Sequence, residues 1–233
     1  MAALKALADR FPAWIMGQIT GSPFTSDYTV KMYNQDGTRY QDILFDKTGN
    51  LLSNGWEMAW LSNDYLEWVE NGKNLCAYEI WPQIYEKAWA LMNGGNYQSL
   101  DYGHSVDMAW KALTGKNATQ VNCTGMDSNG ILQVINNAVA VGKIVCVATK
   151  PLANAKELTD ANGLAGMATD AHAYYLTGDT INGYTLNNPW GKKIVNNSTA
   201  ISQNVLMQDL KDKSGVLDIS QYIYCVYILD PII

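Results

Sequence analysis

Residues 171–191 read AHAYYLTGDTINGYTLNNPWG, and this stretch decides how the rest of the chain is interpreted. Residues 172–177 and 184–188 contain the aromatic and β-branched side chains that favour strands. Between them, Asp179–Gly183 supplies Asp, Asn and Gly, which commonly form turns. The stretch therefore predicts an antiparallel β-hairpin.

The predicted hairpin implies a specific pairing of its strands. If Thr177 and Gly183 flank a five-residue loop, His172 lies directly opposite Asn188. Directly opposed residues in an antiparallel ladder have Cβ atoms about 4.5–5.5 Å apart. We therefore expect a hydrogen bond between these two side chains.

This pair suits the chemistry of a thiol nucleophile. Such a nucleophile needs a base within hydrogen-bond reach, and the base needs a third group that fixes its tautomer. An Asn188 oxygen that accepts from one ring nitrogen of His172 would aim the other nitrogen at a sulfur, and Trp190 could shield that bond. On spacing alone the alternative, a hydrogen-bonded core histidine beside an ordinary core tryptophan, stays open.

The segments around the hairpin predict a helix, two strands and a loop. Apolar residues repeat at helical spacing from Ser128, which can cap a helix, to about Val141. Apolar runs at 143–149 and 222–229 predict strands. Residues 150–170 are rich in Ala, Gly, Asn and Asp and predict a loop. The second half of the chain is therefore expected to be rich in strands.

The first half of the chain is expected to be richer in helix. Apolar residues at helical spacing predict one helix over residues 1–11 and another over Glu79–Met92. Strand-like runs at 28–33 and 40–45 flank Asn34–Gly37, which is a hairpin signal. Together the two halves predict an α+β fold.

Composition and charge narrow the function classes. Hydrophobic residues make up 48% of the 233 residues and charged residues 16%, as in globular proteins. The net charge of −6 argues against nucleic acid or an anionic membrane as a partner. No apolar run approaches the ~20 residues that span a bilayer. We expect a soluble protein of undetermined compartment, with the cytoplasm favoured.

The cysteines do not suggest a metal site. Four of them (Cys76, Cys123, Cys146 and Cys225) lie far apart, and the chain has only two histidines, so we expect no metal centre. Cys146 and Cys225 lie within apolar, strand-like runs and are expected to be buried as small hydrophobic residues.

Motifs along nearly the whole chain resemble those of calpain-family cysteine peptidases. H-A-Y-Y-L-T-G and N-N-P-W-G are similar to the family signatures H-A-Y-S-V-T-G and R-N-P-W-G. Residues 77–90 resemble the family's E-x-W-x-x-x-x-E-K-A-Y-A helix. Residues 131–138 with 142–146 resemble the helix and strand ahead of its histidine loop, and residues 215–222 resemble the closing segment of its second lobe.

The resemblance implies a papain-like core with the active site between two lobes. Residues 1–110 would be the remainder of the helix-rich catalytic lobe, and residues 111–233 the antiparallel-sheet lobe, joined near residues 98–115. His172 falls on the family's catalytic histidine, and Asn188 on its catalytic asparagine. Trp190 falls on the tryptophan that shields the pair. The implied activity is that of a cysteine-type endopeptidase.

The family's nucleophilic cysteine has no counterpart in this sequence. It belongs to a G-D-C-W run at a helix start, and the end of that run matches Met1–Leu4, so the cysteine would stand three residues upstream of Met1. Cys76 precedes a different helix, and Cys123 lies in a linker-like N-C-T-G. The upstream glutamine that helps to form the family's oxyanion hole is missing as well. We therefore expect this chain to be a fragment that does not cleave peptides by itself.

A protein or peptide substrate is expected, and the loop before the histidine could contact it through Gly166, Asp170 and Ala171. An ordinary solvated loop is the alternative. No cofactor follows from the residues. The resemblance makes Ca²⁺ possible, but Lys192 and Lys193 stand where calcium-binding relatives are acidic, and a hard cation needs several oxygen ligands.

Two further functions stay open at this point. A chain that truly begins at Met1 would be a non-catalytic pseudopeptidase that binds peptides or a partner domain. A structural module without a functional cleft is more remote. An in-frame G-D-C-W in the DNA upstream of Met1 would favour the peptidase over the pseudopeptidase.

Overall fold

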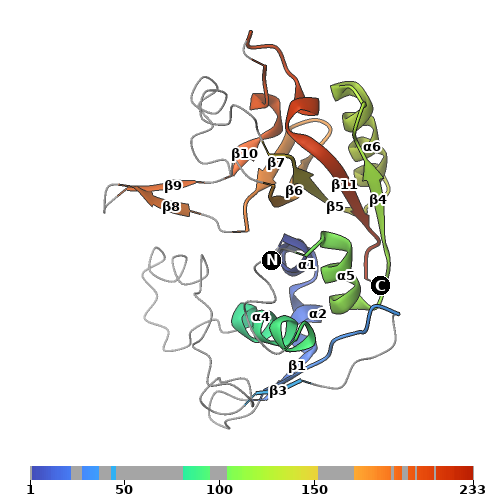
Figure 1. The fold of residues 1–233 in the computed structure, drawn as a ribbon, viewed down its shortest axis with the longest axis vertical. Helices are drawn as coiled ribbons and strands as arrows, with labels where there is room; N and C mark the ends of the chain where they lie inside the picture. Colours follow the sequence, from blue (N-terminus) through green and yellow to red (C-terminus); the bar gives the residue numbers. More distant parts are fainter. Residues whose placement is uncertain are drawn as a thin grey trace. The chain divides into compact units, whose positions relative to one another are not determined.

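The computed structural model describes residues 2–21, 28–36, 43–45, 81–94, 104–151, 171–189, 192–195, 199–202, 204–212 and 214–232. The chain divides into two compact units. The first runs from Leu7 to Asn117, and the second comprises Ala2–Ala6 together with Ala118–Ile233. Helices dominate the first unit and an antiparallel sheet dominates the second (Figure 1), so the predicted α+β class is confirmed. The assignment of residues 1–110 and 111–233 as catalytic lobes stays a prediction.

The first unit combines short helices with a small sheet. Its helices are α2 (Pro12–Gly17), α4 (Trp81–Met92) and α5 (Val106–Thr114), and α1 (Ala2–Arg10) leads into α2. Pro12 occupies the first turn of α2, where its missing N–H costs nothing, and α1 ends just before it. The strands β1 (Ile19–Gly21), β2 (Tyr28–Val30) and β3 (Ile43–Phe45) pair antiparallel in that order, which confirms the predicted pairing of the 28–33 and 40–45 runs.

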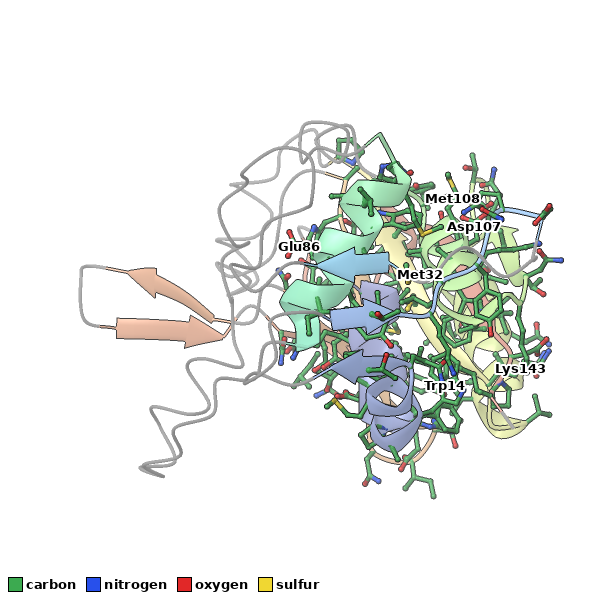
Figure 2. The ribbon with its side chains drawn as sticks, turned by 90° about the horizontal axis from the view of Figure 1, so that it is seen from below. Trp14, Met32, Glu86, Asp107, Met108 and Lys143 are labelled. Atoms are coloured by element: carbon green, nitrogen blue, oxygen red, sulfur yellow. The ribbon has the colours of Figure 1, made fainter. Side chains whose placement is uncertain are left out.

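Apolar side chains and hydrogen bonds hold these elements together. Met32 and Trp110 are almost completely buried. The Tyr85 hydroxyl donates to the Ile15 carbonyl at 2.9 Å, and the Tyr33 N–H donates to the Ala112 carbonyl at 2.8 Å. Helix α4 packs against β2, and Figure 2 shows the three strands beside this helix, with Met32 labelled close by. The small sheet is thus tied to α2, α4 and α5.

The second unit is built on a six-stranded antiparallel sheet. Its strands are β4 (Ala118–Asn122), β5 (Ile144–Thr149), β6 (Ala173–Asp179), β7 (Gly183–Asn187), β10 (Val205–Leu206) and β11 (Ile223–Leu229). They lie in the order β10-β7-β6-β5-β11-β4. Strands β8 (Lys192–Val195) and β9 (Thr199–Ser202) form a separate hairpin, and short 3₁₀ helices η2 (Met207–Asp209) and η3 (Ile219–Gln221) precede β11. Most neighbours in the large sheet are therefore distant in sequence.

Helix α6 (Ser128–Ala140) covers one face of the large sheet. It packs against β5 and β11 (Figure 1), and it buries Ile131, Ile135 and Ala138 in a core shared with Val147 and Tyr174. This helix and β5 match the predicted helix and strand closely.

The start of α6 differs from the prediction in its capping residue. Asp127, not Ser128, is the N-cap, because its carboxylate accepts the backbone N–H of Gly130 at 2.7 Å. The Ser128 hydroxyl instead donates to the Asp218 carboxylate at 3.3 Å.

The β6–β7 hairpin exists, but its predicted register was wrong by two residues. Thr177 pairs with Thr185, and the ladder continues to Asp179↔Gly183, so the loop has three residues instead of five. The Asp179 carboxylate accepts the backbone N–H groups of Ile181 and Asn182, which closes the shorter turn. His172 and Asn188 are therefore diagonal neighbours beyond the ladder and do not face each other directly.

Several expected features lie outside the described residues. They include residues 152–170 of the predicted loop and residue 1 of the helix predicted over residues 1–11. In the described part of the chain, no helix combines the length and the hydrophobicity needed to cross a membrane.

Candidate active site

His172 and Asn188 meet just beyond the ends of two neighbouring strands. His172 precedes β6 and Asn188 follows β7, and these strands lie side by side in the sheet (Figure 1). The His172 Nε2 and the Asn188 Oδ1 are 3.0 Å apart. Diagonal neighbours across a ladder are about 7–8 Å apart at the backbone, which long side chains can span. The predicted contact between His172 and Asn188 is thus present, although the strand register from which we predicted it is incorrect.

The bond fixes the tautomer of the histidine. An amide oxygen can only accept, so the His172 Nε2 must carry the hydrogen and donate it to the Asn188 Oδ1. In the neutral ring, Nδ1 then carries the lone pair that can accept a proton. This is the arrangement that a general base requires, because the accepting nitrogen is defined and the ring is oriented by a third group.

Burial keeps the ring neutral. Desolvation lowers the pKa of His172 below its ordinary value, and the hydrogen bond to Asn188 opposes that effect by stabilising the charged ring. The Tyr174 ring meets the His172 ring edge-on, with centroids 5.1 Å apart. Asn188 itself is only 3% exposed. The Asn188 side of the bond is therefore shielded from water, while His172 is half-buried.

Two polar side chains fix the backbone on either side of the pair. Thr149, at the end of β5, bonds to both the N–H and the carbonyl of His172. On the other side, the Asn204 Oδ1 accepts the backbone N–H of Asn188 at 3.0 Å. The sequence offered no motif that would have identified either residue. For Thr149 the available signal is a polar residue at the end of an otherwise apolar strand.

The adjacent Asn187 has a structural role. Its side-chain Nδ2 donates to the Thr177 hydroxyl at 2.8 Å and to the Thr185 carbonyl at 3.2 Å. These bonds lie within the β6–β7 hairpin, whereas Asn188 bonds to His172. Asn187 therefore stabilises the hairpin, whereas Asn188 orients His172.

The described cysteines are poorly suited to be nucleophiles. Cys123, Cys146 and Cys225 are all buried thiols outside any disulfide, and this burial confirms the expectation for the last two. Burial raises the pKa of Cys123 and raises that of Cys146 to about 12, so both thiols stay protonated near neutral pH. As the linker-like N-C-T-G suggested, Cys123 lies in the connection between β4 and α6, where it directly follows β4 and donates its N–H to the Tyr224 carbonyl. Cys76 lies outside the described residues.

The remaining predicted site residues are placed only in part. Ala171 is an exposed residue at a bend directly before His172. Trp190, Gly166 and Asp170 lie outside the described residues, so their suggested roles stay predictions. Within the described ranges, no group of three or more His, Cys, Asp or Glu side chains could hold a metal ion.

The comparison with protein families bears directly on this site. A sequence model of the calpain family cysteine protease matches residues 63–206, which is more than half of the chain. The chain belongs to the calpain family of cysteine proteases. The region that matches the calpain family includes both strands of the β6–β7 hairpin and the two residues that flank it, His172 and Asn188. None of the curated proteins matches this calpain-family chain.

Proposed function

We propose that this chain is the greater part of the catalytic core of a calpain-like cysteine endopeptidase. The 3.0 Å bond between the His172 Nε2 and the Asn188 Oδ1 carries the proposal. It supplies a base with a defined tautomer in a protected environment, and family membership gives peptidase chemistry as its context. His172 is the general base and acid, and Asn188 orients it.

The proposed architecture is a papain-like pair of lobes. A helix-rich unit followed by a unit built on an antiparallel sheet is what such a core requires. The sheet unit carries the base and its orienting asparagine.

The proposed nucleophile is a cysteine outside these 233 residues, just ahead of α1. Cys123 and Cys146 are buried thiols of raised pKa, which favours a thiol from elsewhere. Residues Ala2–Ala6, which begin α1, belong to the same compact unit as His172. The N-terminal end of a helix favours a thiolate, because its unpaired N–H groups and dipole stabilise negative charge. On this proposal the 233 residues by themselves are inactive.

The proposed reaction follows from the tautomer. The His172 Nδ1 takes the proton of the cysteine thiol, and the thiolate attacks the scissile carbonyl of a peptide or protein. The protonated ring then gives its proton to the leaving amine. After that step the neutral ring activates water, which releases the acyl group. Asn188 holds the ring in place throughout, and no metal ion is needed at the reacting atoms. The proposed reaction assigns no step to calcium.

The test compares the 233-residue chain with a longer chain that carries the genomic codons upstream of Met1. Each is treated with a peptide-based, thiol-directed irreversible inhibitor, and the labelled residue is located by mass spectrometry. We expect labelling of one upstream cysteine in the longer chain and none of the shorter chain's cysteines. His172→Ala should reduce that labelling about 10²-fold or more, because the thiolate is lost with its base. Asn188→Ala should give a smaller reduction.

Three outcomes would overturn the proposal. The first is a stop codon directly before Met1 with no upstream cysteine, which would favour a non-catalytic binding module. The second is labelling in the longer chain that persists undiminished in His172→Ala. The third is His172-dependent labelling of Cys76 in the short chain, for which Cys76→Ala is the matched control.

A further inference from the structure

We propose that Thr149 is a positioning residue for His172, an inference that rests on the proposed catalytic role of that histidine. Thr149 is the last residue of β5 and is completely buried. Its hydroxyl does not simply fill space in the core, because both of its hydrogen bonds go to the main chain of His172. Buried polar groups are nearly always hydrogen-bonded, and here both bonds of one buried hydroxyl go to a single residue, His172.

Three hydrogen bonds join the two residues. The Thr149 N–H donates to the His172 carbonyl at 2.8 Å, and the Thr149 hydroxyl donates to the same carbonyl at 3.2 Å. In return, the His172 N–H donates to the Thr149 Oγ1 at 3.1 Å. The hydroxyl is therefore a donor and an acceptor at once, and it holds both the N–H and the carbonyl of His172.

The position of Thr149 in the sheet explains why a side chain is used. The β5–β6 ladder ends at Ala148↔Ala173, so Thr149 and His172 would form its next pair. In a regular pair of this kind, the His172 N–H would bond to the backbone carbonyl of Thr149. Here the hydroxyl takes that N–H, so His172 can leave the regular strand path and still be held. The ring can then reach Asn188.

The opposite side of Thr149 is also fixed. The pairing of β11 with β5 shifts between Ile223↔Thr149 and Cys225↔Ala148, so Tyr224 is an extra residue beside the end of β5. Such bulges change the direction of neighbouring side chains. The next residue, Lys150, donates its N–H to the Tyr222 carbonyl at 2.9 Å and its Nζ to the Ser220 carbonyl at 2.6 Å. Thr149 is thus held from β11 while it holds His172.

The test follows His172 by NMR in the 233-residue chain. The chain has only two histidines, so His104 is an internal reference, and His172→Gln assigns the signals. Thr149→Ser and Thr149→Ala differ from each other only in the hydroxyl, and Thr149→Val keeps the branched shape without it. Thr177→Val is the matched control, because it removes another bonded hydroxyl of this sheet, the one that accepts from Asn187.

We expect Thr149→Ser and Thr177→Val to leave the His172 titration close to that of the parent chain. In Thr149→Ala and Thr149→Val, the pKa of His172 should move upward toward its ordinary value because the ring becomes more hydrated. Exchange of the His172 Nε2–H with water should become about tenfold faster or more. The chemical shift of His104, compared at one pH, should be the same in every variant.

Equal behaviour of the Ser and Ala variants would overturn the proposal, because the hydroxyl would then be irrelevant. An unchanged His172 titration in Thr149→Val would do the same. If the Val variant does not fold, the Ser and Ala pair still decides. None of these measurements needs a nucleophile, so the proposed peptidase function can fail in the labelling test while the positioning contact stands.

Discussion

His172 occupies an environment in which the neutral ring is favoured, and this gives the chain a specific pH dependence. Its pKa in the folded state lies below the ordinary value of ~6.5 because the ring is buried. Between the folded and unfolded values, the unfolded chain therefore binds more protons, so stability is lost as the pH falls through ~6.5. We expect the urea midpoint of the parent chain to fall more steeply between pH 7.5 and 5.5 than that of His172→Gln. Parallel curves for the two chains would contradict this expectation.

The Asn188 side chain acts on the same ring in the opposite direction. Its oxygen accepts from the His172 Nε2–H and so favours the protonated ring. Asn188→Leu keeps a side chain of similar size without an acceptor, and we expect the pKa of His172 to fall further in this variant. An NMR titration measures it, with His104 as the reference. An upward shift would mean that hydration, and not the lost bond, dominates.

At the scale of single residues, the sequence predicted the contact between His172 and Asn188 but not the residues that hold their backbones. The spacing of His172 and Asn188 was sufficient because a shift of two residues leaves the side chains on the same face of the hairpin. Thr149 and Asn204 could not be predicted, because their roles depend on where strands β5 and β10 end relative to the pair.

At the scale of elements, the β6–β7 turn depends on a glycine that lies inside the ladder. Gly178 has φ +104°, and a Cβ there would lie 2.1 Å from the Gly183 carbonyl oxygen. Gly142 is the matched control, because its φ is +75° but nothing lies within 4 Å of its would-be Cβ. We expect Gly142→Ala to cost about 1–2 kcal/mol, from backbone conformation alone. Gly178→Ala should cost clearly more, as measured by urea unfolding. Equal costs would show that the turn can relax.

The N-cap of α6 offers a second test at this scale. Asp127→Ala should reduce the free energy of unfolding by about 1 kcal/mol, because the Gly130 N–H loses its acceptor. Asp127→Ser should restore most of the loss. If Ser128→Ala costs more than Asp127→Ala, the bond between Ser128 and Asp218 matters more than the cap.

Local patterns predicted individual elements better than their pairing. Helix α6 was found because its apolar residues repeat at helical spacing, and strand β5 because it is a short, continuous apolar run. The hairpin turn was predicted too long because Asp179 was treated only as a loop residue, whereas its carboxylate closes a turn while its backbone stays in the ladder. The order β10-β7-β6-β5-β11-β4 was beyond prediction, since it joins segments that are distant in sequence.

For the molecule as a whole, the buried cysteines report on opening of the second unit. Cys146 is 0% exposed in the middle of β5, and the pKa of its thiol is about 12. We expect its alkylation at pH 8 to be negligible in the folded chain and to rise with urea in parallel with global unfolding. Mass spectrometry of the labelled peptides measures this. Labelling of Cys146 well before the unfolding transition would show that β5 opens locally.

The position of β11 has a consequence for the way the chain becomes a folded protein. Strands β4 and β5 do not pair with each other, because β11 lies between them and pairs with both. At ~5–20 residues per second, a ribosome needs on the order of 5 to 20 s to proceed from β4 to β11. During that interval β4 has no partner in the large sheet and β5 has an open edge, which is the kind of surface that binds other nascent chains. Synthesis of this chain therefore includes a period in which these unpaired strand edges favour association with other chains.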